Sequence, residues 1–508
     1  MIFKKAIKQT LSWLTISFFV LWGNQGISQE MFGVTLGNYN GLTGAIINPA
    51  IMTNTRNYLE INFLAADIFA NNTMAYIPAS DLTIWGALNP NTKFPVYGSK
   101  NNSFLIYNNR DKKSAIQNTR ILGPSAMFQY GKHAFAITTG FRFFTSANNI
   151  PWEMPVFGYE GMDYGPVNNV NFDDYNIDVE TQAWMEVGLS YAYEAYHFMD
   201  DQVTVGVTAR KLWGYAGVYG QINNASYIIP NDSVLNILNL NGETAFSVPV
   251  DYSTNDFPVN DPVFKGSGIG FDVGVIYTKR RYVDDNRWEK PCGQEFKDYI
   301  YRIGLSVIDI GRIKYSHNAQ VHSYDDVSAY WVNYDTISYS TVNDVVGEIS
   351  NVFYGDPTAS YRGNSFTIGL PTALSLQFDY HPLRLRDVYF GLVWIQPVRF
   401  NRHSLRRPAQ ISIVPRYETK YLEFSLPISL FEYRYPRVGF AARFAFLTIG
   451  TERIGTYLGL GDLNGLDIYF SIKLNIAKGS CKKVVPVKCL NYEYGYSDKD
   501  KARFRKRK

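Results

Sequence analysis

Six histidines are the side chains of this sequence best suited to acid–base or metal chemistry near neutral pH. They are His133, His197, His317, His322, His381 and His403. No two have the HxxxH spacing that places two imidazoles on one helix face. All fall at the ends of expected strands or in connections, so no strand core offers a serine–histidine pair for acyl transfer. The sequence therefore predicts no catalytic residue and a protein that is not an enzyme.

One histidine pair shares a connection with carboxylates. His317 and His322 lie near Asp325 and Asp326, and imidazole with carboxylate is a ligand set that binds zinc. A solvated polar loop has the same composition, and this simpler interpretation is the one we adopt. Neither a metal nor a cofactor is expected.

Three cysteines, Cys292, Cys481 and Cys489, are candidates for a disulfide. A bridge could join Cys292 to the C-terminal tail, or Cys481 to Cys489, and one thiol is left over in either case. Disulfides need an oxidising compartment, and residues 1–29 indicate one. They have lysines, an apolar stretch and a small-residue patch, which is the pattern of a signal peptide cleaved near Gln29.

Abundant aromatic residues narrow the fold class of the exported chain. The sequence has 38 Tyr and 33 Phe but only 19% charged residues. This composition is typical of chains with many strands, including transmembrane β-barrels. The net charge of +4 is too small to indicate a nucleic-acid partner.

Apolar and polar residues alternate with a period of two in many segments, for example 133–146 and 181–193. Each such segment has one continuous apolar face, as a half-buried strand does. The connections between segments alternate between tight turns and long loops, of which 316–362 is one. That arrangement is typical of an outer-membrane barrel, although a soluble protein of several sandwiches also alternates. We predict an all-β fold: a transmembrane antiparallel β-barrel of about 14 strands over residues 56–476.

The polar faces of these strands would line the barrel lumen. An Arg or Lys facing lipid near the midplane would cost about 2–4 kcal/mol, so the strand phase is strongly constrained. The lumen-facing polar residues are expected to be Glu60, Arg142, Glu186, Arg210, Asp272, Arg302, Asp379, Arg416, Glu423, Arg443, Asp467 and Lys473. Their mixed signs favour a lumen braced by ion pairs over the single-sign ring of a selective pore. The inward glycines Gly188, Gly206, Gly270, Gly274 and Gly304 would leave room for a plug or for large neighbouring side chains.

The two ends of the mature chain have different expected roles. Residues 30–55 are rich in Gly, Asn and Thr, contain the step Asn48-Pro49-Ala50, and would fold back into the barrel as a plug. Residues 477–508 form a basic tail that would lie in the periplasm as a solvated end or as a contact for an anionic partner.

The Asn48-Pro49-Ala50 step ahead of such a barrel resembles the FadL-like fatty-acid transport family and its relatives among Bacteroidota type IX secretion barrels. The chain is also similar to an uncharacterised Bacteroidota outer-membrane barrel family through "YRIGLSVIDIGRIKY" (301–315) and "LTIGTERIGTYLGLGDLNGLDIYFSIKLNI" (447–476). These resemblances imply a roughly fourteen-stranded barrel with its N-terminal segment in the lumen. The charged lumen is a departure from the fatty-acid transporters.

Two classes of function remain. The leading hypothesis is a subunit or docking platform of a secretion, assembly or surface-attachment machine. The alternative is a FadL-like transporter or channel for small hydrophobic or amphipathic molecules. The expected partners are outer-membrane lipid and lipopolysaccharide, and proteins bound by the extracellular loops and the tail. The aromatic residues of the connection 316–362, such as Tyr330, Trp331 and Tyr334, are suited to a protein interface.

Overall fold

Exposed apolar and buried polar residues alternate along the strands of the computed structural model. On β7 (Asn171–Phe198), Met185 and Leu189 are exposed, whereas Glu186 and Ser190 are buried. The structure describes residues 31–83, 86, 104–162, 164–257, 262–281, 298–334, 339–382, 384–385 and 387–477. The expected signal peptide, all three cysteines and the tail from residue 478 onward lie outside these ranges.

The strands close into one antiparallel ring of fourteen positions, because β1 pairs with β23 on one side and with β4 and β5 on the other. In ring order the positions are β1 (Asn57–Asn72), β4 (Lys113–Leu122) with β5 (Ser125–Tyr130), β6 (His133–Ile150), β7, β8 (Asp201–Asn231), β10 (Gly266–Arg280), β11 (Tyr299–Tyr315), β14 (Phe366–Gly369) with β15 (Ala373–Tyr380), β16 (Val388–Pro397), β17 (Gln410–Glu418), β18 (Leu422–Ser425) with β19 (Ile428–Phe431), β20 (Tyr435–Val438) with β21 (Phe440–Phe444), β22 (Leu447–Thr451) and β23 (Gly465–Ala477). The prediction of a barrel of about fourteen strands is confirmed.

Proline explains most of the interruptions within ring positions. Pro124 separates β4 from β5, Pro371 separates β14 from β15, and Pro427 separates β18 from β19. Proline has no N–H to donate to a neighbouring strand, so it breaks the ladder locally while the chain continues in the same direction.

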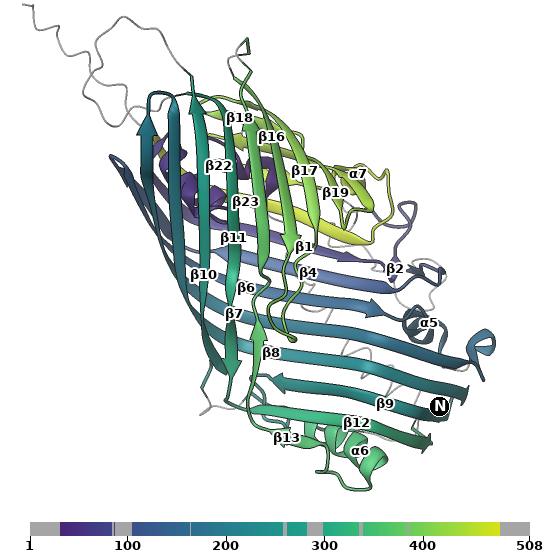
Figure 1. The fold of residues 1–508 in the computed structure, drawn as a ribbon. Helices are drawn as coiled ribbons and strands as arrows, with labels where there is room; N and C mark the ends of the chain where they lie inside the picture. Colours follow the sequence, from purple (N-terminus) through teal and green to yellow (C-terminus); the bar gives the residue numbers. More distant parts are fainter. Residues whose placement is uncertain are drawn as a thin grey trace, which may run out of the picture.

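One side of the barrel is much taller than the other (Figure 1). β7 and β8 have 28 and 31 residues, and the far half of β8 pairs with β9 (Val234–Ser247). β12 (Ala319–Val332) and β13 (Tyr361–Gly363) extend this sheet beyond β9. We expected the connection 316–362 to be a long loop, and this was wrong, because it contains β12, α6 and β13. Strand pairing between distant segments, rather than local alternation, orders it.

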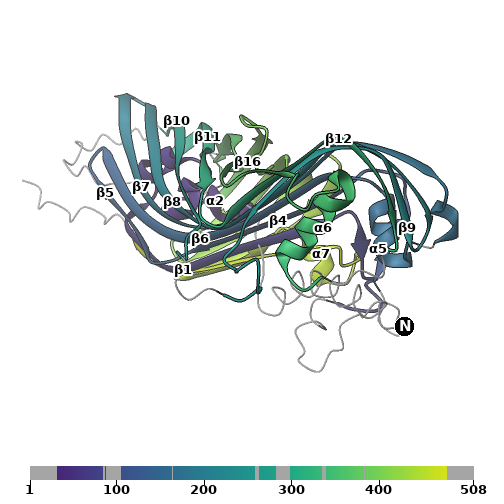
Figure 2. The same ribbon diagram turned by 90° about the horizontal axis from the view of Figure 1, so that it is seen from below.

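Short helices lie at both ends of the barrel. α5 (Glu153–Glu160), η2 (Gly165–Val167), α6 (Val342–Tyr354), α7 (Ile454–Tyr457) and the ribbon of β2 (Ala75–Tyr76) with β3 (Leu105–Ile106) accompany the tall end. α2 (Phe32–Thr35), α3 (Gly41–Ala45) and η1 (Pro49–Asn54) lie inside the ring at the opposite end (Figures 1 and 2). None of the helices in the described ranges has the length and apolar character needed to span a bilayer.

The outer surface of the ring is an apolar belt to which every strand position contributes. Exposed members are Phe63, Phe128, Phe135, Ile137, Leu189, Val207, Val273, Leu305, Phe378, Phe390, Ile413, Phe424, Phe440, Ile449 and Leu474. A closed ring satisfies its backbone hydrogen bonds internally, so such a belt can face lipid. The protein is an outer-membrane β-barrel. The two-residue turns 131–132, 199–200 and 445–446 join neighbouring strands of the ring at the end where α2 and α3 lie, and short turns between ring strands are typical of the periplasmic end.

Leu189→Arg tests the assignment of the lipid-facing belt. Leu189 is 63% exposed on the membrane part of β7, so the arginine should cost about 2–4 kcal/mol and lower the yield of folded barrel. The measurement is the fraction that migrates as the compact form on unheated gels. Leu238→Arg is the matched control, because Leu238 is also exposed but lies on β9 beyond the belt. Equal folding of the two variants would contradict the belt.

Candidate functional site

A cluster of four arginines around one carboxylate crosses the middle of the lumen. Asp309 on β11 lies 2.8 Å from Arg142 and 3.0 Å from Arg210, measured between side-chain N and O atoms. Arg120 approaches the same carboxylate to 3.6 Å, and Arg407 is also paired with it. These arginines come from β4, β6, β8 and the β16–β17 connection, so one carboxylate joins four parts of the chain.

Asp309 reaches this position through a bulge. Its φ of 55° is in the left-handed region, and the β10–β11 register shifts between Phe271 and Val273. The extra residue reverses the inward phase of β11, so that Gly304 points inward before the bulge and Ile313 after it. The Asp309 N–H donates to Asp272 at 2.7 Å, which fixes the bulge. A non-glycine residue in this conformation stores strain, which is common at functional sites.

Sequence reasoning identified four members of this cluster and missed three. Arg142, Glu186, Arg210 and Asp272 were expected in the lumen, and each has a partner in the cluster. Asp309 was missed because alternation alone does not reveal a bulge. Arg120 was missed because the strand around it is rich in polar residues on both faces, and Arg407 because it lies in a connection.

Of the other expected lumen residues, all but Asp467 lie nearer the periplasmic end and form ion pairs with one another, whereas Asp467 pairs in register with Phe69 of β1 on the extracellular side. Arg302 and Arg416 share Asp379 at 2.6 and 2.8 Å. Arg443 pairs with Glu423 at 2.9 Å, and Lys473 with Glu60 at 3.3 Å. Asp467 is fully buried and accepts the Glu452 N–H at 3.1 Å. The wall therefore neutralises most of its buried charge without help from other parts of the chain.

Residues 31–55, here called the N-terminal segment, are almost entirely buried between these wall residues. Wall carboxylates accept its backbone N–H groups: Glu452 from Gly33 at 3.1 Å, Glu418 from Asn38 at 2.7 Å, and Glu60 from Gly41 at 2.8 Å. Gly41 is the first residue of α3, and a carboxylate there meets the positive end of the helix dipole. The wall thus holds this segment by its backbone.

Three wall glycines make room for Asn48-Pro49-Ala50. A Cβ on Gly206 would lie 2.4 Å from the Ala50 nitrogen, and one on Gly274 would lie 2.1 Å from the Asn48 Oδ1. Gly304 also faces Asn48, whose amide donates to Gln377 at 2.8 Å. β8, β10 and β11 are consecutive in the ring, so their glycines form a trough in which the chain backbone lies.

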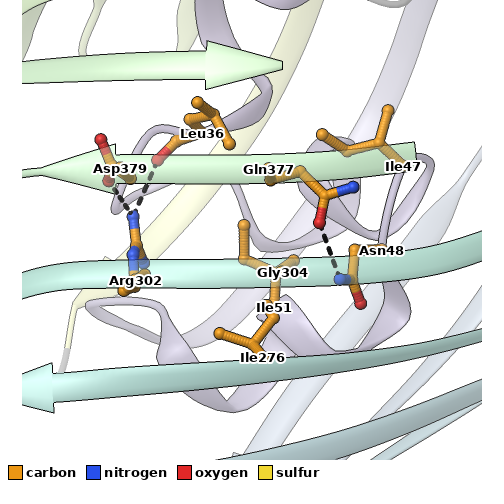
Figure 3. Close-up of a pocket in the computed structure, with 9 residues that line it drawn as sticks. All are labelled: Leu36, Ile47, Asn48, Ile51, Ile276, Arg302, Gly304, Gln377 and Asp379. Atoms are coloured by element: carbon orange, nitrogen blue, oxygen red, sulfur yellow. Dashed lines mark hydrogen bonds and ion pairs between the residues drawn. The ribbon is translucent and has the colours of Figure 1, made fainter. Parts of the chain in front are cut away.

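A small cavity remains between the N-terminal segment and the wall (Figure 3). It has space for roughly one water molecule. Leu36, Ile47 and Ile51 line it from the segment side, and Ile276 and Arg302 are among the wall residues. Its lining combines aliphatic side chains with one ion pair, so it is amphipathic.

The lumen on the extracellular side of the Asp309 cluster is filled by apolar side chains. This apolar layer consists of Phe69, Ile116, Phe144, Trp184, Leu212, Tyr219, Ala245, Ile313, Tyr315, Ala319, Phe366, Ile368, Leu370, Leu405 and Phe431. Arg142 stacks on Trp184, with its guanidinium 4.8 Å from the ring centroid. The N-terminal segment, the charged cluster and the apolar layer therefore succeed one another along the barrel axis.

The histidine–aspartate connection does not form a metal site. His322 makes contacts from Nδ1 to Ser360 at 2.9 Å and from Nε2 to Gln320 at 3.2 Å, so both ring nitrogens are already engaged. Within the ranges that the structure describes, no group of three or more His, Cys, Asp or Glu residues has metal-binding geometry.

Comparisons with known proteins give one family match and several remote structural likenesses. A model described as "Family of unknown function (DUF5723)" matches residues 49–452, and no curated protein matches the sequence. The toluene transporter TbuX of Ralstonia pickettii has 8% identity and a TM-score of 0.38, covering 89% of this chain and 96% of its own. A FadL homologue of Pseudomonas aeruginosa has 10% identity and a TM-score of 0.39, covering 89% and 98%. The translocator domain of NalP from Neisseria meningitidis has 6% identity and a TM-score of 0.32, covering 88% and 100%.

Asp309→Asn should destabilise the barrel, because it removes the carboxylate that Arg120, Arg142, Arg210 and Arg407 share. Breaking a buried ion pair costs about 3–5 kcal/mol. The temperature at which the compact form disappears on gels should fall markedly. Asp325→Asn is the matched control: Asp325 pairs with Arg362, but its side chain is 66% exposed, so little change is expected. A similar effect of both substitutions would show that the cluster does not support the fold.

Gly274→Val should displace the N-terminal segment, because the new side chain would occupy the position of the Asn48 amide. Thermolysin should then cleave within residues 41–55 faster than in the unmodified protein, while the barrel stays compact on gels. Gly220→Val is the control, since a Cβ at Gly220 meets nothing within 4 Å. Unchanged cleavage of the Gly274 variant would contradict the packing of Asn48 in the trough.

Proposed function

The chain belongs to the DUF5723 family of unknown function, and we propose that its barrel is a gated channel for small hydrophobic or amphipathic molecules. In this proposal the N-terminal segment is the gate, and the structure corresponds to the closed form. The proposal replaces the docking platform that the sequence favoured.

The observation that carries the proposal is the absence of charge in the N-terminal segment. Residues 31–55 contain no Asp, Glu, Lys or Arg, although the wall around them is densely charged. The wall pairs Arg302 and Arg416 with Asp379, and Arg443 with Glu423, independently of the segment. Withdrawing the segment therefore breaks hydrogen bonds that water can replace, but it leaves the ion pairs of Asp379 and Glu423 intact.

A permanent brace would be built differently. Buried carboxylates such as Glu452 and Glu418 would be held most firmly by arginine or lysine from the segment, because charge-assisted pairs with both partners ionised are the strongest. Here they receive backbone and amide N–H groups of a neutral chain instead. The N-terminal segment is therefore held by neutral N–H donors and packs against wall glycines. Such a segment can leave the wall and bind again without separating an ion pair.

The residues that line the small cavity between the N-terminal segment and the wall indicate which class of molecule the channel would carry. Ile276 and the aliphatic side chains of the segment face the cavity together with the Arg302–Asp379 pair. The charged lumen seemed to argue against apolar cargo. Since its charges are satisfied among themselves, the surfaces left for cargo are aliphatic, glycine-rich or capable of a few hydrogen bonds, as in most small-molecule sites.

A docking platform remains the second candidate because of the tall wall. β8, β9 and β12 extend beyond the membrane belt together with α5 and α6 (Figure 1). Tyr330 on β12 is 65% exposed and Leu238 on β9 is 45% exposed there. Exposed aromatic and aliphatic side chains beyond the membrane favour contact with other proteins, such as components of a secretion or surface-attachment machine.

A reversible tether distinguishes the gate from a fixed plug. The hydroxyls of Thr53 and Thr204 lie 3.3 Å apart, so Thr53→Cys with Thr204→Cys should form a disulfide between the segment and β8. The three native cysteines are replaced by serine in this background. Uptake of a fluorescent apolar probe into proteoliposomes should fall about tenfold when the pair is oxidised and recover on reduction.

Thr53→Cys alone is the control and should transport in both redox states. Undiminished uptake by the oxidised pair would show that the segment is not the gate. No uptake by any form, including the unmodified protein, would contradict the channel and favour the docking platform.

A further inference from the structure

The connection between β16 and β17 leaves the wall and enters the lumen. Residues 398–409, here called the arginine loop, contain four arginines: Arg399, Arg402, Arg406 and Arg407. Ser404, Leu405 and Arg407 are only 3%, 1% and 2% exposed. An extracellular loop that merely covered the barrel mouth would be much more exposed.

On the side of the barrel from which it arises, the arginine loop forms a short backbone pairing with β14 of the wall. Gly369 of β14 donates its N–H to the His403 carbonyl at 2.8 Å, and Leu405 donates to the Gly369 carbonyl at 3.2 Å. A Cβ on Gly369 would lie 2.3 Å from the Ser404 hydroxyl. The loop backbone therefore lies directly against the inner surface of the wall.

Its side chains reach the opposite side of the barrel. The Arg406 backbone N–H donates to Ser146 at 3.1 Å, and its guanidinium donates to Asn148 at 2.9 Å. Both acceptors belong to β6, which is seven positions from β17 in the ring of fourteen and so lies across the lumen. The loop spans the barrel from wall to wall.

Further contacts fix the loop along the tall wall. Arg402 donates to Gln221 at 2.8 Å on β8, and Arg399 pairs with Asp178 at 3.1 Å on β7. The His403 ring stacks on Tyr219 with 4.0 Å between centroids. Burial lowers the pKa of the His403 imidazole, which favours the neutral form of the stacked ring. Leu405 packs in the apolar layer, and Arg407 ends at Asp309.

We propose that the arginine loop is a second barrier in the lumen, on the extracellular side of the Asp309 cluster and independent of the N-terminal segment. The inference deepens the proposed function, on which it rests for the idea that the lumen is a route. A molecule entering from outside meets the loop first, and a path opens only when both bodies have moved.

The independence follows from the separate partners of the two bodies. The loop makes hydrogen bonds and ion pairs with β6, β7, β8 and β14, and with Glu243, Asp309, Pro371, Thr372 and Glu432. The segment is bound by a different set, including Glu60, Glu418, Gln377 and Thr204. Because the two sets do not overlap, removing one body leaves the contacts of the other in place.

Conductance in planar bilayers tests the proposal with four proteins. They are the unmodified barrel, a deletion of residues 31–55, a barrel with residues 399–407 replaced by Gly-Asn-Gly-Ser, and the combination of both changes. The first three should show little conductance, and the combination should conduct at least about tenfold more than either single change. Full conductance after deletion of the N-terminal segment alone would overturn the second barrier.

The readout separates this proposal from the proposed function. Ion conductance reports a water path whether or not an apolar probe is transported. The expected differences in conductance among the four proteins therefore do not depend on the outcome of the uptake experiment. Conversely, a loop that proves to be no barrier leaves the redox-dependent uptake of the tethered pair intact.

A labelling experiment covers the case in which the deletion does not assemble. Thr372→Cys places a thiol beside Pro371, whose carbonyl accepts from Arg407 at 3.0 Å. A membrane-impermeant maleimide added to intact cells should label it slowly, and about tenfold faster when Arg407→Gln or the shortened loop is combined with it. Arg434→Gln, which removes an exposed arginine paired with Asp111, is the charge-matched control and should not change the rate. Equal rates in all variants would overturn the barrier.

Discussion

The interior of this barrel depends on one requirement, that buried charges are paired, and Asp309 is the residue on which most of this pairing converges. A charge enclosed by a ring of strands in lipid has no bulk water to solvate it, so it must be paired within the lumen. Four arginines from four parts of the chain converge on Asp309, and Asp272 and Glu186 complete the cluster. The bulge in β11, the inward phase of β4, β6 and β8, and the inward course of the arginine loop are all required for that convergence.

The cluster divides the lumen into two parts with different contents. On the periplasmic side lies a neutral segment bound by its backbone, and on the extracellular side lie an apolar layer and a cationic loop. A wall that pairs its own charges permits this division. The N-terminal segment neutralises no buried ion, and Asp309 keeps Arg142 and Arg210 of the wall when Arg407 of the loop moves away. A route through the barrel is therefore compatible with a densely charged interior. This is why the charged lumen, which first favoured a docking platform, is not evidence against a channel.

Period-two alternation, taken together with the alternating connection lengths and the expected signal peptide, was sufficient to predict the fold class, the outer membrane as location and the approximate number of strands. The reason is physical: a charge on the wrong face costs several kcal/mol, so the sequence records the phase of each membrane strand. The same signal fails where that cost is absent. β9 and β12 stand beyond the membrane, where either face tolerates polar residues, and we expected loops there.

The parts of the lumen that sequence reasoning missed depend on single positions rather than on patterns. One extra residue at Asp309 reverses the phase of β11, and nothing in the local sequence marks it. Arg407 acts at a distance from its own strands because the loop folds inward. The inward glycines were expected to leave room for a plug or for large neighbours. A side chain on Gly206, Gly274 or Gly304 would collide with Asn48-Pro49-Ala50 or its partner Gln377.

Hydrogen exchange of residues 31–55 in the mature barrel tests the central claim most directly, because it reports whether this segment is seated and whether it can leave. The account predicts exchange that is much slower than in an unstructured peptide for the amides of Gly41 and Leu42, which donate to Glu60. It also predicts that these amides exchange together, and well before those of the surrounding strands. Exchange at the rate of a free peptide would show that the segment does not occupy the lumen, and exchange only together with the strands would show that it is a fixed part of the barrel.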